Sequence, residues 1–206
     1  MRILVDGEAA DEAVAGGEAL TEVYLRVVGE LAARGRTVVG VSLDGRTLTQ
    51  EDQTKVLDGE TLGEALDLRT VSTRELATAT LGEVAKHVDR ARKGLRTAVE
   101  RLGAGDRTEA LAAFQPTLEI WMAVCEAVQK VCIVSDIDIT ADLAGTSVAG
   151  EHGKIVDALG DVQSALAQQD WVKLADVLEY EMLPATERWR TVVTSLLEKL
   201  QSDGRA

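Results

Sequence analysis

Residues 65–84 read ALDLRTVSTRELATATLGEV, and the hydrophobic pattern of the chain changes inside this stretch. Up to Val71, apolar and polar residues alternate, which is typical of a half-buried strand. From Ser72 onward the apolar residues recur every three or four positions, and the segment Ser72-Thr73-Arg74-Glu75 fits the capping box that begins a helix. The change predicts a β-containing domain over residues 1–71 and a helical domain over residues 72–206.

The first domain contains short apolar runs separated by turn residues. Its sequence predicts strands at 2–5, 37–43 and 65–71, a weak return strand at 8–14 and a helix at 18–33. This order of elements resembles a β-grasp, or ubiquitin-like, domain. The sulfur carriers and modifiers among such domains act through a flexible C-terminal Gly-Gly, whereas here Val71 runs into a helix and the chain ends Gly204-Arg205-Ala206. The resemblance therefore implies an interaction or structural role.

The second domain is a series of long amphipathic helices. Apolar stripes predict helices at 72–102, 106–132 and 155–166, with an irregular connection at 137–150, and a last helix from Asp170 to the end. Short connections at two junctions favour antiparallel neighbours. The predicted fold class is thus α+β, a small β-grasp-like domain followed by an antiparallel four-helix bundle. Pro116 and Pro184 fall inside predicted helices and are expected to kink or divide them.

Charge and composition restrict the classes of partner. The 206 residues carry a net charge of −13, which disfavours binding to nucleic acid or to an anionic membrane surface. Residues 1–11 are too charged for a secretory signal, and no apolar run is long enough to span a bilayer. Cys125 and Cys132 are seven residues apart on one predicted helix and are expected to be reduced core residues. We therefore expect a cytoplasmic protein.

The sequence predicts no catalytic, cofactor-binding or metal-binding residue. His87 and His152 lack the Glu-x-x-His spacing of a di-iron bundle, and the aspartates at 136, 138 and 142 lack the spacing of a calcium loop. Nucleophile-elbow and phosphate-loop motifs are also missing from the sequence. We therefore expect a protein that is not an enzyme and has no cofactor.

Four residues are candidates for binding a partner. Trp171 and Tyr180 are two of only six aromatic residues, and aromatic side chains anchor interfaces when they are exposed. Ile120 and Val124 lie in a segment that is apolar around most of its helix, which is typical of a crowded core or of a second binding face. The third tryptophan, Trp189, is expected in the core.

These features lead to one functional hypothesis and two alternatives. The first is a non-enzymatic cytosolic protein-interaction module, an adaptor or chaperone-like factor, whose protein partner is basic or an amphipathic helix. One alternative is a structural protein that self-associates as a homodimer through residues 120–134. The other is an enzyme whose site, with His152 and Glu181 as members, is not visible as a motif.

Overall fold

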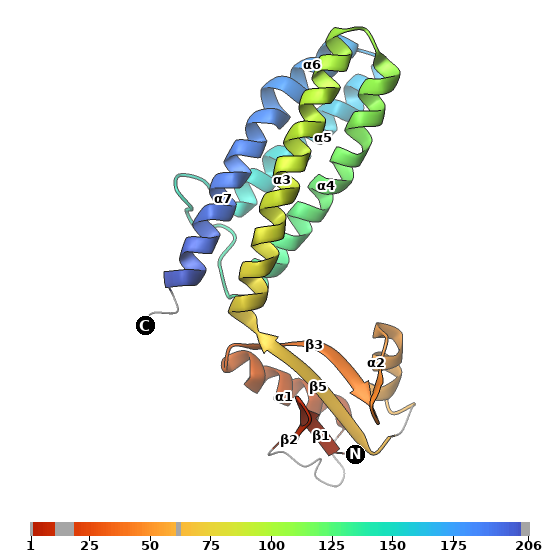
Figure 1. Cartoon of the computed structure of the whole chain (residues 1–206), viewed down its shortest axis with the longest axis vertical. Helices are drawn as coiled ribbons and strands as arrows, with labels where there is room; N and C mark the ends of the chain where they lie inside the picture. Colours follow the sequence, from red (N-terminus) through yellow and green to blue (C-terminus); the bar gives the residue numbers. More distant parts are fainter. Residues whose placement is uncertain (1, 11–18, 61–62, 203–206) are drawn as a thin grey trace. The chain divides into compact units, whose positions relative to one another are not determined.

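The computed structural model describes residues 2–10, 19–60 and 63–202. The chain divides into two compact units, Met1–Leu76 and Ala77–Ala206, which we call the sheet unit and the helical unit. Figure 1 shows strands and short helices in the first and long helices in the second. The fold class is α+β, as predicted. The structure divides the chain after Leu76, whereas the sequence suggested a division after Val71.

The described strands of the sheet unit form one mixed five-stranded sheet in the order β2-β1-β5-β3-β4. These strands are β1 (Arg2–Val5), β2 (Glu8–Ala9), β3 (Arg36–Leu43), β4 (Arg46–Thr47) and β5 (Ala65–Ser72). The central pair, β1 and β5, is parallel, and the other pairs are antiparallel. The parallel register places Ile3 beside Leu66 and Val5 beside Leu68.

Helix α1 (Leu20–Ala33) supplies much of the remaining core of this unit. Its buried residues Val23, Val27 and Leu31 are spaced by four, so that they share one helix face. They form one cluster with the buried side chains of the sheet and with Val56 from helix α2 (Gln50–Leu57).

Asp6 joins three strands at the end of β1. It has a left-handed backbone conformation, with φ of 53°, and begins the turn toward β2. Its carboxylate accepts hydrogen bonds from the Thr70 backbone N–H and the Thr70 hydroxyl, both at 2.7 Å, and from Arg36 Nη2 at 2.9 Å. Hydrogen bonds from Thr70, then from Arg36, lower the pKa of Asp6 below its usual value, although burial opposes them.

The predicted helix start at Ser72 is confirmed. Helix α3 (Thr73–Gly103) follows β5 directly, and the Glu75 backbone N–H donates to Ser72 Oγ at 3.4 Å. The Thr73 backbone N–H donates to the Gly35 carbonyl oxygen at 2.9 Å, and the hydroxyls of Thr73 and Thr37 are 2.7 Å apart. These bonds satisfy the first turn of the helix, where backbone donors lack intrahelical partners.

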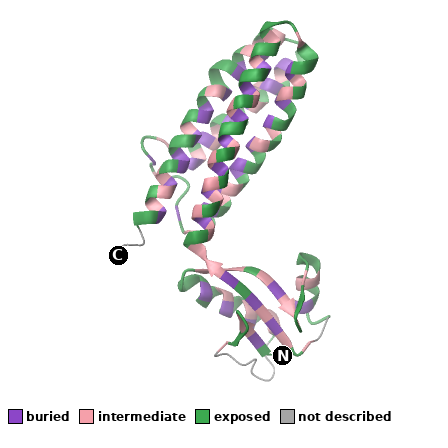
Figure 2. Cartoon of the chain, in the orientation of Figure 1, coloured by how far each residue is buried: buried purple, intermediate pink, exposed green. Residues whose placement is uncertain are grey.

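The long helices of the second unit share one hydrophobic core. They are α3, α4 (Arg107–Val134), α5 (Val148–Gln168) and a continuous segment made of α6 (Trp171–Asp176), η1 (Val177–Met182) and α7 (Leu183–Ser202). Figure 2 shows buried residues recurring along each of them. Asp106, Ser147 and Asp170 cap α4, α5 and α6 by accepting from backbone N–H groups at 3.2, 3.0 and 2.9 Å. Trp189 is fully buried, as expected.

Helices α3 and α4 are in close contact where Gly94 meets Thr117. A Cβ atom on Gly94 would collide with Thr117 Oγ1, a hydroxyl that donates to the Ala113 carbonyl oxygen of its own helix at 3.1 Å. Thr117 is only 2% exposed, so it has little room to move. The contact therefore depends on glycine at position 94.

The two prolines have different effects. Helix α4 continues as an α-helix through Pro116, so it is not divided there. Before Pro184 the chain forms the π-helical segment η1, in which each backbone N–H bonds five residues back. Proline has no N–H and its ring clashes with the carbonyl four residues earlier in an α-helix. The irregularity expected near Pro184 thus takes the form of a π turn.

Some predicted elements differ from the structure. Helix α5 begins at Val148, although an irregular connection was expected up to Gly150. Helix α2 and strand β4 were not predicted. The predicted return strand is present as β2, but its part beyond Ala10 lies outside the described residues.

Candidate functional site

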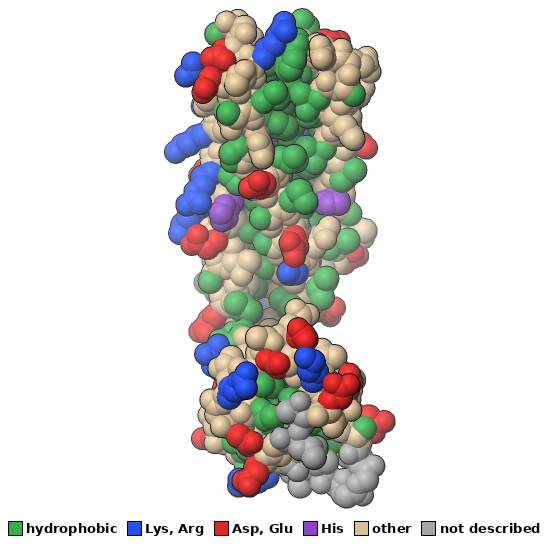
Figure 3. All heavy atoms as spheres, turned by 90° about the vertical axis from the view of Figure 1, so that its right-hand side faces the viewer, with side chains coloured by type: hydrophobic (Ala, Val, Ile, Leu, Met, Phe, Trp, Pro, Cys, Tyr) green, Lys and Arg blue, Asp and Glu red, His purple; other side chains and the backbone are tan. Residues whose placement is uncertain are grey.

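An open groove of about 340 Å³ lies between α4 and α5. Most of its lining side chains are apolar, and on each helix they recur at steps of three and four, so that each helix forms one wall. The lining residues are Trp121, Met122, Cys125, Glu126, Gln129, His152, Ile155, Val156 and Leu159. Figure 3, which looks onto the side of α4, shows hydrophobic side chains gathered in a strip along the helices.

The inner part of the groove is continuous with the core. Trp121 is fully buried and packs edge-on against Trp189 of α7, with ring centroids 6.0 Å apart and an interplanar angle of 64°. Such T-shaped aromatic pairs are favourable. Neither indole N–H has an acceptor among the described residues. The inner surface of the groove thus includes a core side chain that is held in place by its packing.

The thiol of Cys125 also lines the groove, and its surroundings do not activate it as a nucleophile. Burial raises the pKa of this thiol to about 11. Because only the thiolate attacks electrophiles, Cys125 is almost entirely in its unreactive form at neutral pH.

The outer edges of the groove expose apolar side chains to solvent. Met122 on α4 is 66% exposed and Val156 on α5 is 52% exposed. Glu126, the acidic residue of the α4 wall, forms an ion pair with Lys130 of the same helix at 2.6 Å. A surface of this kind, apolar and without a cover within the described residues, is typical of a binding site for another molecule.

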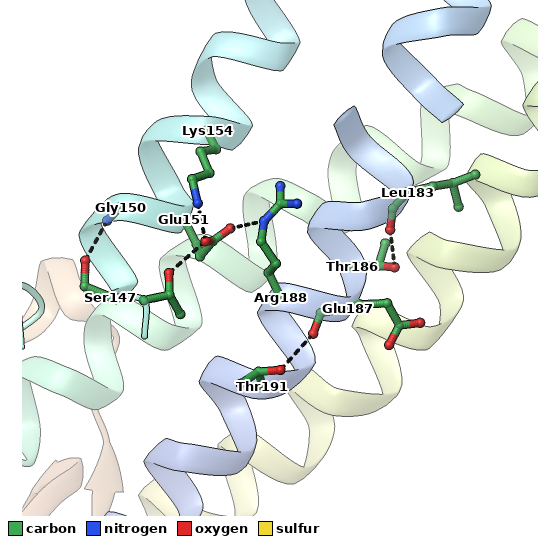
Figure 4. Close-up of polar contacts among 10 residues, drawn as sticks. Ser147, Gly150, Glu151, Lys154, Leu183, Thr186, Glu187, Arg188 and Thr191 are labelled. Atoms are coloured by element: carbon green, nitrogen blue, oxygen red, sulfur yellow. Dashed lines mark hydrogen bonds and ion pairs between the residues drawn. The ribbon is translucent and has the colours of Figure 1, made fainter. Parts of the chain in front are cut away.

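A buried carboxylate lies beside the groove at the beginning of α5. Glu151 is fully buried, although it precedes the groove residue His152 directly. Figure 4 shows the side chains of Lys154 and Arg188 pointing toward its carboxylate. Its Oε1 accepts from Thr146 Oγ1 and Lys154 Nζ, both at 2.7 Å, and its Oε2 accepts from Arg188 Nε on α7, also at 2.7 Å. Glu151 therefore links the loop before α5 and helix α5 itself to helix α7.

The electrostatics of Glu151 favour its charged form. Burial disfavours the charge, but the hydrogen bonds from Lys154, Arg188 and Thr146 outweigh it and lower the pKa of Glu151 below its ordinary value. The carboxylate also lies in the first turn of α5, where the helix dipole favours negative charge. With three donors bound, it is occupied as a structural group that holds the start of α5 to α7.

The residues predicted to bind a partner have different environments. Tyr180 is 68% exposed on η1, and Trp171 is half-buried at the start of α6, with the Arg107 guanidinium 4.9 Å from its ring centroid. Ile120 is half-buried and packs against the core, and Val124 is only 1% exposed. They lie on two separate helical segments, and none of them lines the α4/α5 groove.

Other residues singled out in the sequence are also separated. His152 is half-buried in the groove wall, whereas Glu181 is exposed on η1. Among the described residues, no group of three or more His, Cys, Asp or Glu side chains is placed to hold a metal ion. None of the described helices combines the length and the apolar character needed to cross a membrane.

Met122, Val156 and Glu151 were not predicted from the sequence as site residues. The sequence did contain a signal for Met122 and Val156, because each is an apolar residue that lies beside the buried stripe of its helix and not within it. No signal marked Glu151, whose burial depends on Arg188, 37 positions further along the chain.

The helical unit corresponds to a known family. Residues 79–192 match the family described as Domain of unknown function (DUF8042). The matched region begins in α3, ends in α7 and contains the groove and the Glu151 cluster. No curated protein and no solved structure matches the chain. Since the matched residues make up more than half of its length, the chain belongs to the family of the Domain of unknown function (DUF8042).

Proposed function

We propose that this protein is a non-enzymatic cytosolic interaction module, an adaptor or chaperone-like factor, that holds an apolar segment of a partner protein in the α4/α5 groove. The observation that carries the proposal is the solvent exposure of Met122 and Val156 around a groove whose inner surface is the core. Covering such side chains releases water from apolar surface, which drives most protein association.

The chemistry of the groove suits binding better than catalysis. Its thiol, Cys125, is kept protonated by burial, and the neighbouring carboxylate of Glu151 already accepts three hydrogen bonds. Met122 is unbranched and flexible, so it adapts to differently shaped apolar partners. The tight inner wall with Trp121 supplies the rigid surface that anchoring side chains need.

The architecture that we propose for the two units agrees with this role. The sheet order, with a parallel central pair and α1 against one part of the core, supports a β-grasp-like sheet unit. The shared core of α3, α4, α5 and the α6–η1–α7 segment supports a four-helix bundle. A β-grasp-like module joined to a helical bundle supplies two separate surfaces, as an adaptor requires.

Site-specific photo-crosslinking tests the proposal in the native host. A photoreactive amino acid is placed at Val156 in the groove or, as a matched control, at Val172, which is 73% exposed on α6 and does not line the groove. We expect one protein to be crosslinked from position 156 and not from position 172. Equal crosslinking from both positions, or none from position 156, would refute the groove as the binding site.

The alternative of self-association is supported by one further observation. Ile133 and Val134, near the end of α4, are 76% and 43% exposed and add apolar surface to the same helix. A homodimer through α4 would give crosslinks only to a second copy of the chain. It would also give a dimer mass in light scattering that does not change on dilution.

A further inference from the structure

We propose that the occupant of the α4/α5 groove is an amphipathic helix with basic residues along its flanks. This inference rests on the function proposed above and names the class of partner. It is drawn from the shape of the groove, from the charges around it and from the polar groups in its walls.

The shape of the groove fits a helix. Its walls are two helices whose lining residues are spaced by three and four, from Trp121 to Gln129 on α4 and from His152 to Leu159 on α5. The two walls span eight and seven residue steps, which corresponds to about 10–12 Å, or roughly two helical turns. A third helix packed along them would present side chains at positions i, i+3, i+4 and i+7, the pattern of helix-in-groove recognition.

The charges around the groove favour a basic partner. From the start of α4 to the end of α5, residues 107–168, the chain has nine acidic and only three basic residues. Each of the three basic side chains is already engaged. Lys130 pairs with Glu126 at 2.6 Å, Lys154 pairs with Glu151 at 2.7 Å, and Arg107 stacks on Trp171.

Acidic side chains remain available to a partner near the groove. Glu119 lies three residues before Met122, on the same side of α4, and Asp157 follows Val156 on α5. Both are exposed and, among the described residues, neither has an ion pair. Lysine or arginine on the flanks of a bound helix would find these carboxylates within reach of a long side chain, whereas acidic flanks would be repelled.

The walls of the groove contain only a few polar groups that can form hydrogen bonds with an occupant. Besides Glu126, which is paired with Lys130, the Gln129 amide and the His152 imidazole are the polar groups that offer hydrogen bonds along a mainly apolar lining. The apolar face of the helix therefore provides the contact area, and the charged flanks set its orientation.

Two matched peptides test the inference with the full-length protein. Both are labelled helices of about 18 residues, or five turns, with the same leucine and methionine stripe. One has lysine on both flanks and the other has glutamate. Binding is measured by fluorescence anisotropy at about 50 and 200 mM salt, between which screening of exposed charges increases.

We expect the lysine peptide to bind roughly tenfold more tightly than the glutamate peptide at low salt, with a smaller ratio at high salt. The variant Val156→Glu should weaken binding of the lysine peptide by roughly tenfold, as the loss of an anchoring contact does. The control Val172→Glu adds the same charge on α6 and should bind like the unaltered protein.

The outcomes separate this inference from the proposed function. Equal affinities for the two peptides would refute the preference for basic flanks. An affinity for the lysine peptide that is unchanged in the Val156→Glu variant would refute the groove as the binding site. If neither peptide binds while photo-crosslinking from position 156 still captures one protein, the helical partner is wrong and the proposed function stands. If position 156 captures nothing, both fail.

Discussion

Replacing Gly94 by alanine should force α3 and α4 apart and destabilise the helical unit. The added Cβ atom would collide with Thr117 Oγ1, which is fixed by its bond to the Ala113 carbonyl oxygen and is buried. Gly82 lies on the same helix and provides the matched control, because a Cβ atom there would meet nothing within 4 Å.

The two substitutions should have opposite signs. Alanine is preferred over glycine inside a helix, so Gly82→Ala should raise the free energy of unfolding by about 0.5–1 kcal/mol. At position 94 the same gain from helix propensity is opposed by overpacking, which lowers the free energy of unfolding by about 1–3 kcal/mol. Gly94→Ala should therefore be less stable than the Gly82→Ala variant by about 2 kcal/mol.

Urea unfolding followed by tryptophan fluorescence measures this difference selectively. All three tryptophans, at positions 121, 171 and 189, belong to the helical unit, so the signal does not report the sheet unit. The variant Thr117→Ala removes the colliding hydroxyl, and the double variant completes a mutant cycle. We expect the double variant to recover at least about 1 kcal/mol relative to the sum of the single changes.

Two results would refute this reasoning. One is a Gly94→Ala variant that is as stable as Gly82→Ala. The other is a mutant cycle with no coupling between positions 94 and 117. Either would mean that the close approach of α3 and α4 is not maintained in solution.

Three further predictions concern polar and titratable groups. Glu151→Gln should lower the free energy of unfolding of the helical unit by about 2–3 kcal/mol, because it removes charge-assisted bonds from a buried site. Since the donors hold the pKa of Glu151 below its ordinary value of 4.5, the unfolded chain binds the proton first as pH falls, and the stability advantage over the variant should shrink below about pH 4.5; an advantage that is undiminished at about pH 2 would contradict this. The Cys125 thiol, with its pKa raised by burial to about 11, should be alkylated by iodoacetamide at about pH 8 far more slowly than free cysteine, and mass spectrometry of the labelled peptide would show this. Asp6→Ala should destabilise the sheet unit by about 1–3 kcal/mol, since it removes the acceptor of the Thr70 N–H from a left-handed position; unchanged hydrogen exchange of the Thr70 amide would count against this role.

Much of the fold could be predicted because its signals are local. The capping residues Ser72, Asp106 and Asp170 each accept from a backbone N–H three residues ahead, as the sequence pattern requires. The buried stripe of α3 from Leu81 to Ala98 has the regular spacing that predicted it. Helix α2 was missed because Val56 is its only buried residue, so it has no apolar stripe to detect.

The candidate site could not be predicted, because it depends on which neighbours cover each side of a helix. Helix α4 is apolar on several sides, and the sequence left open whether one of them faces a partner or all of them face the core. The structure buries Val124 and exposes Met122, two positions away. An acidic residue in the first turn of a helix is usually exposed to solvent. Glu151 is buried there because Arg188 of α7, distant in the sequence, donates a hydrogen bond to it. These are properties of tertiary packing and not of local pattern.

The π-helical segment η1 accommodates one residue more than a regular spacing of the core positions requires. One row of buried positions from α6 to α7 runs through Leu174, Leu178, Met182, Thr186, Trp189, Val193, Leu196 and Leu200, and the buried residues Val177, Ala185 and Val192 lie directly beside it. The steps are four, four, four, three, four, three and four, which is one residue more than a strict alternation of four and three. The wider π turn takes up that residue and at the same time gives the ring of Pro184 room.

Deleting one exposed residue of η1, such as Tyr180, would restore the alternation from Leu174 to the end of α7 without moving a core position to solvent. The same deletion between Thr186 and Trp189 would turn every later side chain by about 100° around the helix axis. Deletion of a single residue is therefore expected to be less damaging at η1, where it crowds the ring of Pro184 again, than in α7, where it displaces every later core side chain, although both belong to one continuous helical segment.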